Sequence, residues 1–125
     1  MIEFRKALSA KLTAINSEVY HQRASDNAEF PYLVYEITNI DYGGEPGSDI
    51  YYIEIEGWDK SETGDTTILE TLMAAVKAGL DKQTITHGSI TAAFFIENQL
   101  ALDNDNDEQI IRRRQSYQAK VYERS

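Results

Sequence analysis

The sequence contains no cysteine, which excludes disulfide bonds, thiolate nucleophiles and cysteine-ligated zinc. Its stability therefore has to come from packing. Long apolar runs are also missing, and none approaches the roughly 20 residues that a helix needs to cross a bilayer. Because Glu3, Arg5 and Lys6 interrupt the N-terminal segment, a signal peptide is not expected either. We expect no membrane partner and a location in the cytoplasm where the chain is made.

The chain has fewer basic than acidic residues. The chain has 12 lysines and arginines against 21 acidic residues, a formal net charge of −9 and a pI of about 4.6. A field of this sign repels a polyanion, so we expect no sequence-specific nucleic-acid partner. The length of 125 residues suits one domain spanning residues 1–125, which buries roughly two-thirds of the unfolded surface.

Recognisable catalytic patterns are lacking as well. His21 and His87 are the only histidines, and neither stands in a metal-binding or general-base motif. No serine lies in a nucleophile elbow, and the glycines form neither a phosphate loop nor a dinucleotide-binding fingerprint. The sequence therefore predicts a protein that is not an enzyme and that holds no cofactor.

An acidic run with aspartates at alternate positions superficially resembles a calcium-binding loop, because calcium prefers clustered oxygen ligands. Counted from Asp103, however, the sixth position is Glu108 instead of glycine and the twelfth is Arg114 instead of glutamate. We interpret the run as the solvated tip of a hairpin, and predict no metal site.

Two segments have the periodicity of amphipathic helices. Phe4, Leu8, Leu12 and Ile15 share one face and predict a helix over residues 3–16. The second helix, over about residues 66–80, follows from apolar residues at helical spacing and from capping side chains in residues 61–65. Its apolar face consists of Leu69, Leu72, Met73, Val76 and Leu80.

Alternating patterns predict strands over residues 32–40 and 51–58, joined by a glycine-rich loop over residues 41–49. Residues 90–102 and the segment after the acidic run form a further predicted hairpin. The resulting order, α-β-β-α-β-β, predicts a single α+β domain with an antiparallel or mixed sheet and both amphipathic helices on one face.

Two turn-rich segments are candidate partner-binding sites, because both are polar and flanked by strands that would hold them in place. The candidate residues of the first are Gly43, Gly44, Glu45, Gly47 and Asp49. Those of the second are Asp103, Asp105 and Asp107.

The only basic cluster is Arg112, Arg113 and Arg114. In a strand, Arg112 and Arg114 point to one face and Arg113 to the other, which weakens a nucleic-acid patch. The arginines are either a charged strand surface that discourages edge aggregation, or, for Arg112 and Arg114, partners of an acidic surface on a neighbouring subunit. The eight tyrosines leave a similar choice between core packing and an interface.

Several pieces occur together in a particular order: an N-terminal helix ending near Ile15, a Val19-Tyr20 pair, Phe30-Pro31-Tyr32 opening a strand, a strand ending in Trp58-Asp59, a helix over residues 69–80 and a C-terminal hairpin. In this order and spacing, the chain resembles the tail-completion or tail-terminator proteins of long-tailed bacteriophages and prophages. The resemblance covers most of the chain and carries no catalytic residue.

The resemblance implies a virion protein that assembles as a ring, typically a hexamer, at the head-proximal end of the tail tube. Its partners would be other copies of itself, the tail tube protein and the head-tail connector, first in the host bacterial cytoplasm and then in the virion tail or neck. Head-closure protein and minor tail component remain alternatives. An acidic module that mimics DNA, and a small enzyme with an uncommon site, are alternatives from other classes.

Overall fold

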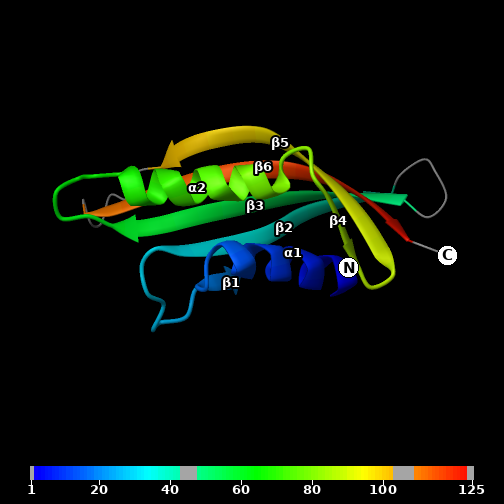
Figure 1. Ribbon diagram of the computed structural model, residues 1–125, viewed down its shortest axis with the longest axis horizontal. Coiled ribbons are helices and arrows are strands. Elements are labelled where there is room, and N and C mark those ends of the chain that lie inside the picture. Colours follow the sequence, from blue (N-terminus) through cyan, green and yellow to red (C-terminus); the bar gives the residue numbers. More distant parts are fainter. Residues whose placement is uncertain (1, 43–47, 103–108, 124–125) are drawn as a thin grey trace.

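The computed structural model describes residues 2–42, 48–102 and 109–123, which fold as two helices against one curled six-stranded sheet (Figure 1). In chain order the elements are α1 (Ile2–Ile15), β1 (Val19–His21), β2 (Tyr32–Tyr42), β3 (Ser48–Lys60), α2 (Thr67–Leu80), β4 (Thr84–His87), β5 (Ile90–Leu102) and β6 (Ile110–Glu123). The strand order is β1-β2-β3-β6-β5-β4. Only β1 and β2 run parallel, so the sheet is mixed and the predicted α+β class is confirmed.

The structure adds two short strands to the predicted order. β1 has three residues and β4 has four, and they occupy the two edges of the sheet. Neither is long enough to show an alternating pattern in the sequence. The element order is therefore α-β-β-β-α-β-β-β.

The α1 helix buries one apolar face, as its periodicity predicts. Phe4, Leu8 and Leu12 are buried. The ring of Phe4 lies 4.6 Å from that of Tyr51 and 5.7 Å from that of Phe94, which ties the helix to β3 and β5. Aromatic contacts of this kind add to the free energy gained from burying the rings.

The α2 helix buries all five residues of its predicted apolar face. The Asp65 carboxylate accepts hydrogen bonds from the backbone N–H of Thr67, at 2.9 Å, and from its hydroxyl, at 2.6 Å. These bonds lower the pKa of Asp65, the hydroxyl bond contributing most. They satisfy one of the N–H groups that a helix start leaves without a partner.

The strands are longer than predicted. β2 continues to Tyr42 and β3 begins at Ser48, so the loop predicted over residues 41–49 is wrong at both ends. β3 also continues two residues past Trp58. Residues 43–47 lie outside the described residues. The cause is cross-strand pairing, which here holds Asp41 and Asp49 in strands although aspartate alone favours turns.

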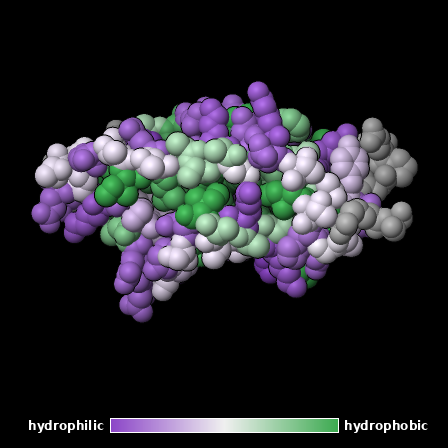
Figure 2. All heavy atoms as spheres, viewed as in Figure 1, coloured by the Kyte–Doolittle hydropathy of each residue, from purple (hydrophilic) through white to green (hydrophobic). Residues whose placement is uncertain are grey.

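Both helices cover the same face of the sheet (Figure 1). In the view of Figure 2, hydrophobic side chains form a discontinuous band along the long axis, bordered by hydrophilic ones. Within the described residues, no helix is long and apolar enough to cross a membrane.

Candidate assembly surface

The face of the sheet that lacks helices carries a row of stacked side chains across three neighbouring strands. Tyr32 on β2 pairs with Trp58 on β3, and Trp58 pairs with Arg112 on β6. The Tyr32 and Trp58 rings are stacked at 5.9 Å with an interplanar angle of 13°, and the Arg112 guanidinium carbon lies 4.2 Å from the Trp58 ring centroid. Stacking and cation–π contacts each stabilise such a row by about 0.5–1.5 kcal/mol.

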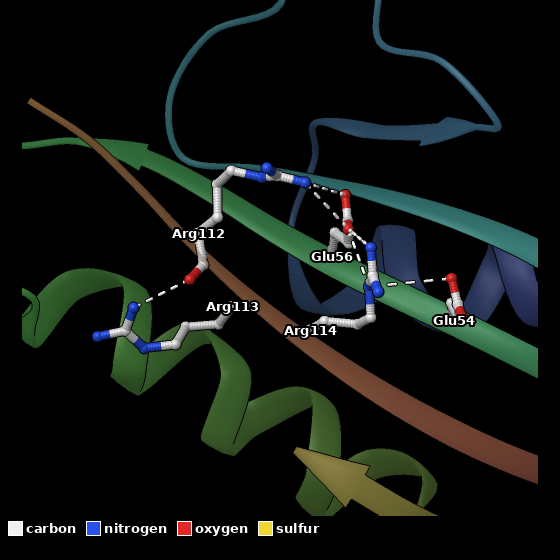
Figure 3. A network of polar contacts seen from close by, with 5 residues as sticks. All are labelled: Glu54, Glu56, Arg112, Arg113 and Arg114. Carbon is white, nitrogen blue, oxygen red and sulfur yellow. Dashed lines mark hydrogen bonds and ion pairs between the residues drawn. The ribbon is translucent and has the colours of Figure 1, made fainter. Parts of the chain in front are cut away.

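Glu56 on β3 connects this row to a second arginine (Figure 3). Its Oε1 accepts hydrogen bonds from Arg114 Nη2 at 2.6 Å and Arg114 Nε at 3.0 Å, and from Arg112 Nη2 at 3.2 Å. The Glu56 side chain is only 17% exposed. Its hydrogen bond raises the pKa of Arg114, so this guanidinium stays charged.

Glu54 completes the network at greater distance. Its Oε2 lies 3.8 Å from Arg114 Nε, and its side chain is 38% exposed. Two carboxylates on β3 therefore face two guanidinium groups on β6. Two donors of the Arg114 guanidinium converge on the same Glu56 oxygen, and these charge-assisted contacts restrict the orientation of both side chains.

Arg113 points the other way, toward α2, as strand alternation predicts (Figure 3). Its Nη1 donates a hydrogen bond to the Arg112 backbone oxygen at 2.9 Å, and its Nη2 lies 3.5 Å from Glu70 on α2. The acidic partners of all three arginines thus lie within the chain.

The sequence-predicted candidate residues do not form one surface. Asp49 pairs with Val121 near the start of β3, whereas Arg112 and Arg114 lie at the other end of the sheet. Val121 and Arg112 are nine positions apart along β6, or about 30 Å. The remaining candidates lie outside the described residues; they are Gly43, Gly44, Glu45, Gly47, Asp103, Asp105 and Asp107.

The strands that lead to the two predicted loops also end at opposite ends of the molecule. β2 ends and β3 begins where Asp49 meets Val121, while β5 ends and β6 begins where Leu102 pairs with Arg112 (Figure 1). Two contact sites at these ends would face in opposite directions.

The histidines do not create a site together. His21 lies on β1 and His87 on β4, at opposite edges of the sheet. Burial lowers the pKa of His21, whose ring lies 5.0 Å from that of Tyr35, and His87 Nδ1 lies 3.6 Å from Glu3 Oε2. Across residues 2–42, 48–102 and 109–123, no group of three or more histidine, aspartate or glutamate side chains could hold a metal ion.

The open face exposes two apolar residues that the sequence pattern does not single out. Phe95 is 51% exposed and Leu100 is 43% exposed, and they pair with Gln118 and Arg114 on β6. In the sequence, the alternation of residues 90–96 is that of a strand buried on one face, so it gives no sign that Phe95 and Leu100 are exposed. The signal that could have found them is the change to polar residues around Asn98, where a bulge shifts the register of β5.

The tyrosines divide between core and surface. Tyr35, Tyr51 and Tyr117 are buried under the helices. Tyr20 and Tyr32 are half-buried and contact each other edge to face at 6.1 Å. Core packing therefore accounts for Tyr35, Tyr51 and Tyr117, while an interface role of Tyr20 and Tyr32 stays a prediction.

No protein-family model matches the chain, and no curated protein matches it. Solved structures do match. One chain of the structure described as the virion of a native gene transfer agent particle superimposes with a TM-score of 0.76 at 12% identity, over 96% of this chain and 95% of that one. The two chains share one fold. A second solved structure matches with a TM-score of 0.63 at 17% identity, over 96% of this chain and 91% of that one.

Proposed function

We propose that this protein is a structural component of a phage-like virion that caps the tail tube as a ring and joins the tail to the head. The observation that carries the proposal is the fold shared with a chain of a gene transfer agent virion over nearly the full length of both chains. The resemblance of the sequence to tail-terminator proteins supplies the specific role. Six identical subunits would form the ring.

The proposed partners are other copies of the chain, the tail tube protein and the head-tail connector. Assembly would occur in the host bacterial cytoplasm, and the finished ring would belong to the tail or neck of the virion. We assign no catalytic residue and no cofactor to this role. The open face, where arginines and carboxylates join β3 to β6, and the strand ends at both ends of the long axis are suited to a part that transmits contacts between two larger bodies.

The docking contacts are proposed in residues 43–49 and 103–108. Because the flanking strands end at opposite ends of the sheet, one segment would contact the tail tube and the other the head connector. Shortening either segment by itself should leave the fold intact, as measured by circular dichroism, and reduce head-tail joining. If both shortened variants complete infectious particles at full yield, these segments are not the docking sites.

The direct test is to mix the purified protein with tail tubes and image them by electron microscopy, with light scattering on the protein alone. We expect rings at one end of each tube. A strict monomer that never binds tube ends would contradict the proposal.

Head-closure protein and minor tail component are the nearest alternatives, and the location of the ring along the neck distinguishes them. The alternative of an acidic DNA mimic receives less support. A mimic displays free carboxylates in one dense row, whereas Glu54 and Glu56 contact arginines of the same chain.

A further inference from the structure

Two strands of the sheet are covered along only part of their outer edges. On one side, β1 pairs with Leu33, Val34 and Tyr35 of β2, and Gln22 N–H donates to the Tyr35 oxygen at 2.8 Å. Within the described part of the chain, no strand pairs with the outer edge of β2 over residues 37–42.

On the other side, β4 pairs with only the first four residues of β5. Phe94 N–H then donates to the Gln83 oxygen at 3.0 Å, and Ile96 N–H to Asp81 Oδ1 at 2.9 Å. Beyond Ile96, none of the described strands pairs with the outer edge of β5, which leaves residues 97–102 uncovered.

The uncovered part of β5 has little to protect it as an edge strand apart from the bulge between Ile96 and Asn98 at its start. Residues 97–102 read ENQLAL, with one charged side chain and neither lysine nor proline. Leu100 is 43% exposed there, and Phe95 just before it is 51% exposed. An unpaired edge flanked by exposed apolar side chains is a template for another strand.

The two uncovered segments are suited to each other in direction. Every step from β2 to β3, β6 and β5 is antiparallel, so β2 and β5 run antiparallel within one sheet. A second copy that continues the sheet with the same face toward the helices would therefore place its β5 antiparallel to β2 of the first. Such a contact is heterologous, since it leaves one uncovered segment on each copy for the next.

Their positions along the strands favour closure over a flat ribbon. Tyr35 and Gln99 lie in the same row across the sheet, so residues 37–42 extend beyond this row on one side and residues 100–102 on the other. From one copy to the next, the sheet would shift by about 15 Å along the strands and by four strand spacings, about 19 Å, across them. A shift in this ratio inclines the strands by roughly 40° to a ring axis. Closed barrels have strand tilts of about 35–45°.

We infer that the ring is closed by β-sheet pairing between residues 37–42 of one copy and residues 97–102 of the next. This inference rests on the proposed function for the ring itself, and it names the contact that forms it. The exposed Leu100 lies within the segment that would pair, and the exposed Phe95 lies just before it.

Two proline substitutions test the contact, one on each edge. Strand alternation past the bulges directs the backbone N–H groups of Ile40 on β2 and Ala101 on β5 outward, away from the sheet. Ile40→Pro and Ala101→Pro each remove one outward donor and spare the internal ladder. Where proline prevents folding, Thr38→Lys and Leu100→Lys place a charge at the same edges. Ile68→Lys, on an exposed position of α2, is the matched control.

Native mass spectrometry at high protein concentration measures the oligomeric state of each variant. We expect rings from the unmodified chain and from Ile68→Lys, and monomers from each edge variant alone. An equimolar mixture of Ile40→Pro and Ala101→Pro should give one-to-one dimers and nothing larger, because one intact edge remains on each variant. Circular dichroism confirms that each variant is folded.

Other results overturn the inference in different ways. If Ile40→Pro alone still forms dimers, β5 pairs with β5 and the contact is isologous. If all folded edge variants still form rings on tail tubes, the proposed function stands and the interface lies elsewhere. If the unmodified chain stays monomeric at high concentration and never binds tube ends, both the inference and the proposed function are wrong.

Discussion

Gly57 determines how closely α2 approaches the sheet. It lies on the helix-covered side of β3, where an added Cβ would be 2.5 Å from Met73 Sδ and 2.8 Å from Leu69 Cδ1. We predict that Gly57→Val lowers the free energy of unfolding by about 1–3 kcal/mol, because α2 has to move outward. The midpoint of urea unfolding measures this loss.

Gly79→Ala is the matched control. The added Cβ would meet only the ends of flexible side chains, Ile15 Cδ1 at 3.1 Å and Lys11 Cε at 3.2 Å. Alanine also favours the helix by about 0.5–1 kcal/mol over glycine. If Gly79→Ala lowers the free energy of unfolding as much as Gly57→Val does, the loss at Gly57 does not come from the lack of space beside it.

The pair formed by Tyr117 and Gln115 is a second residue-scale feature. The buried Tyr117 hydroxyl donates to Gln115 Oε1 at 2.5 Å, and Gln115 Nε2 donates to the Met73 oxygen at 2.9 Å. Burial, with a smaller contribution from Asp81, raises the pKa of Tyr117, so the hydroxyl stays protonated and remains a donor. The pair joins β6 to α2 through polar atoms inside the core.

We predict that Tyr117→Phe lowers the free energy of unfolding by about 1–3 kcal/mol, because Gln115 Oε1 loses its donor in the core. Combining it with Gln115→Met should recover part of the loss, since no lone acceptor is then buried. Thermal and urea unfolding of the two single variants and the double variant measure this. Strictly additive losses would contradict the explanation.

At the scale of elements, the network on the open face joins β3 to β6. We predict that Glu56→Gln lowers the free energy of unfolding by about 1 kcal/mol, because Arg112 and Arg114 lose their shared charged partner in a half-buried site. Glu54→Gln, which removes only the 3.8 Å contact, should change it by less than about 0.5 kcal/mol. Equal effects in urea unfolding at low salt would argue against a special role of Glu56.

The long elements could be predicted from the sequence because each buries one face. Both helices were found within one or two residues, and the two-residue alternation of β3 appears as buried Ile53 and Ile55 beside half-buried Glu54 and Glu56. β1 and β4 could not, since the three residues of β1 and the four of β4 contain no full period.

The candidate surface depends on register between strands that are far apart in the chain, which a sequence pattern does not contain. Alternation places Arg112 and Arg114 on one face, as predicted. That they meet Glu56 requires β3 and β6 to be neighbours in a particular register, although 56 residues separate Glu56 from Arg112. Of the two interpretations that the sequence leaves open for Arg112 and Arg114, a charged strand surface or partners of an acidic surface on a neighbouring subunit, neither predicts the contact with Glu56 of the same chain.

At the scale of the whole molecule, the net charge determines whether the protein binds DNA. If the ring surrounds a DNA channel, subunits with a net charge of −9 should let DNA pass without binding it. We predict no mobility shift of linear duplex DNA at moderate salt. A tight complex that weakens steeply with salt would count strongly against this arrangement.

The proposed function makes a prediction for the particle. A terminator caps a polymer whose subunits otherwise add without limit, so deleting the gene should block head-tail joining and leave DNA packaging unchanged. Heads filled with DNA should accumulate beside unattached tubes, some of them abnormally long, in electron micrographs of lysates. Supplying the protein in trans should restore capped tubes and infectivity without any added cofactor.

The edge variants connect this particle-scale result to the inferred contact. Supplied in trans, Ile68→Lys should restore joining, whereas Ala101→Pro and Ile40→Pro should each fail, and the two together should also fail because a ring needs two intact edges on every subunit. Joined virions from a clean deletion would refute the terminator role. Empty heads would instead point to head closure, because DNA then leaks from a head that is not sealed.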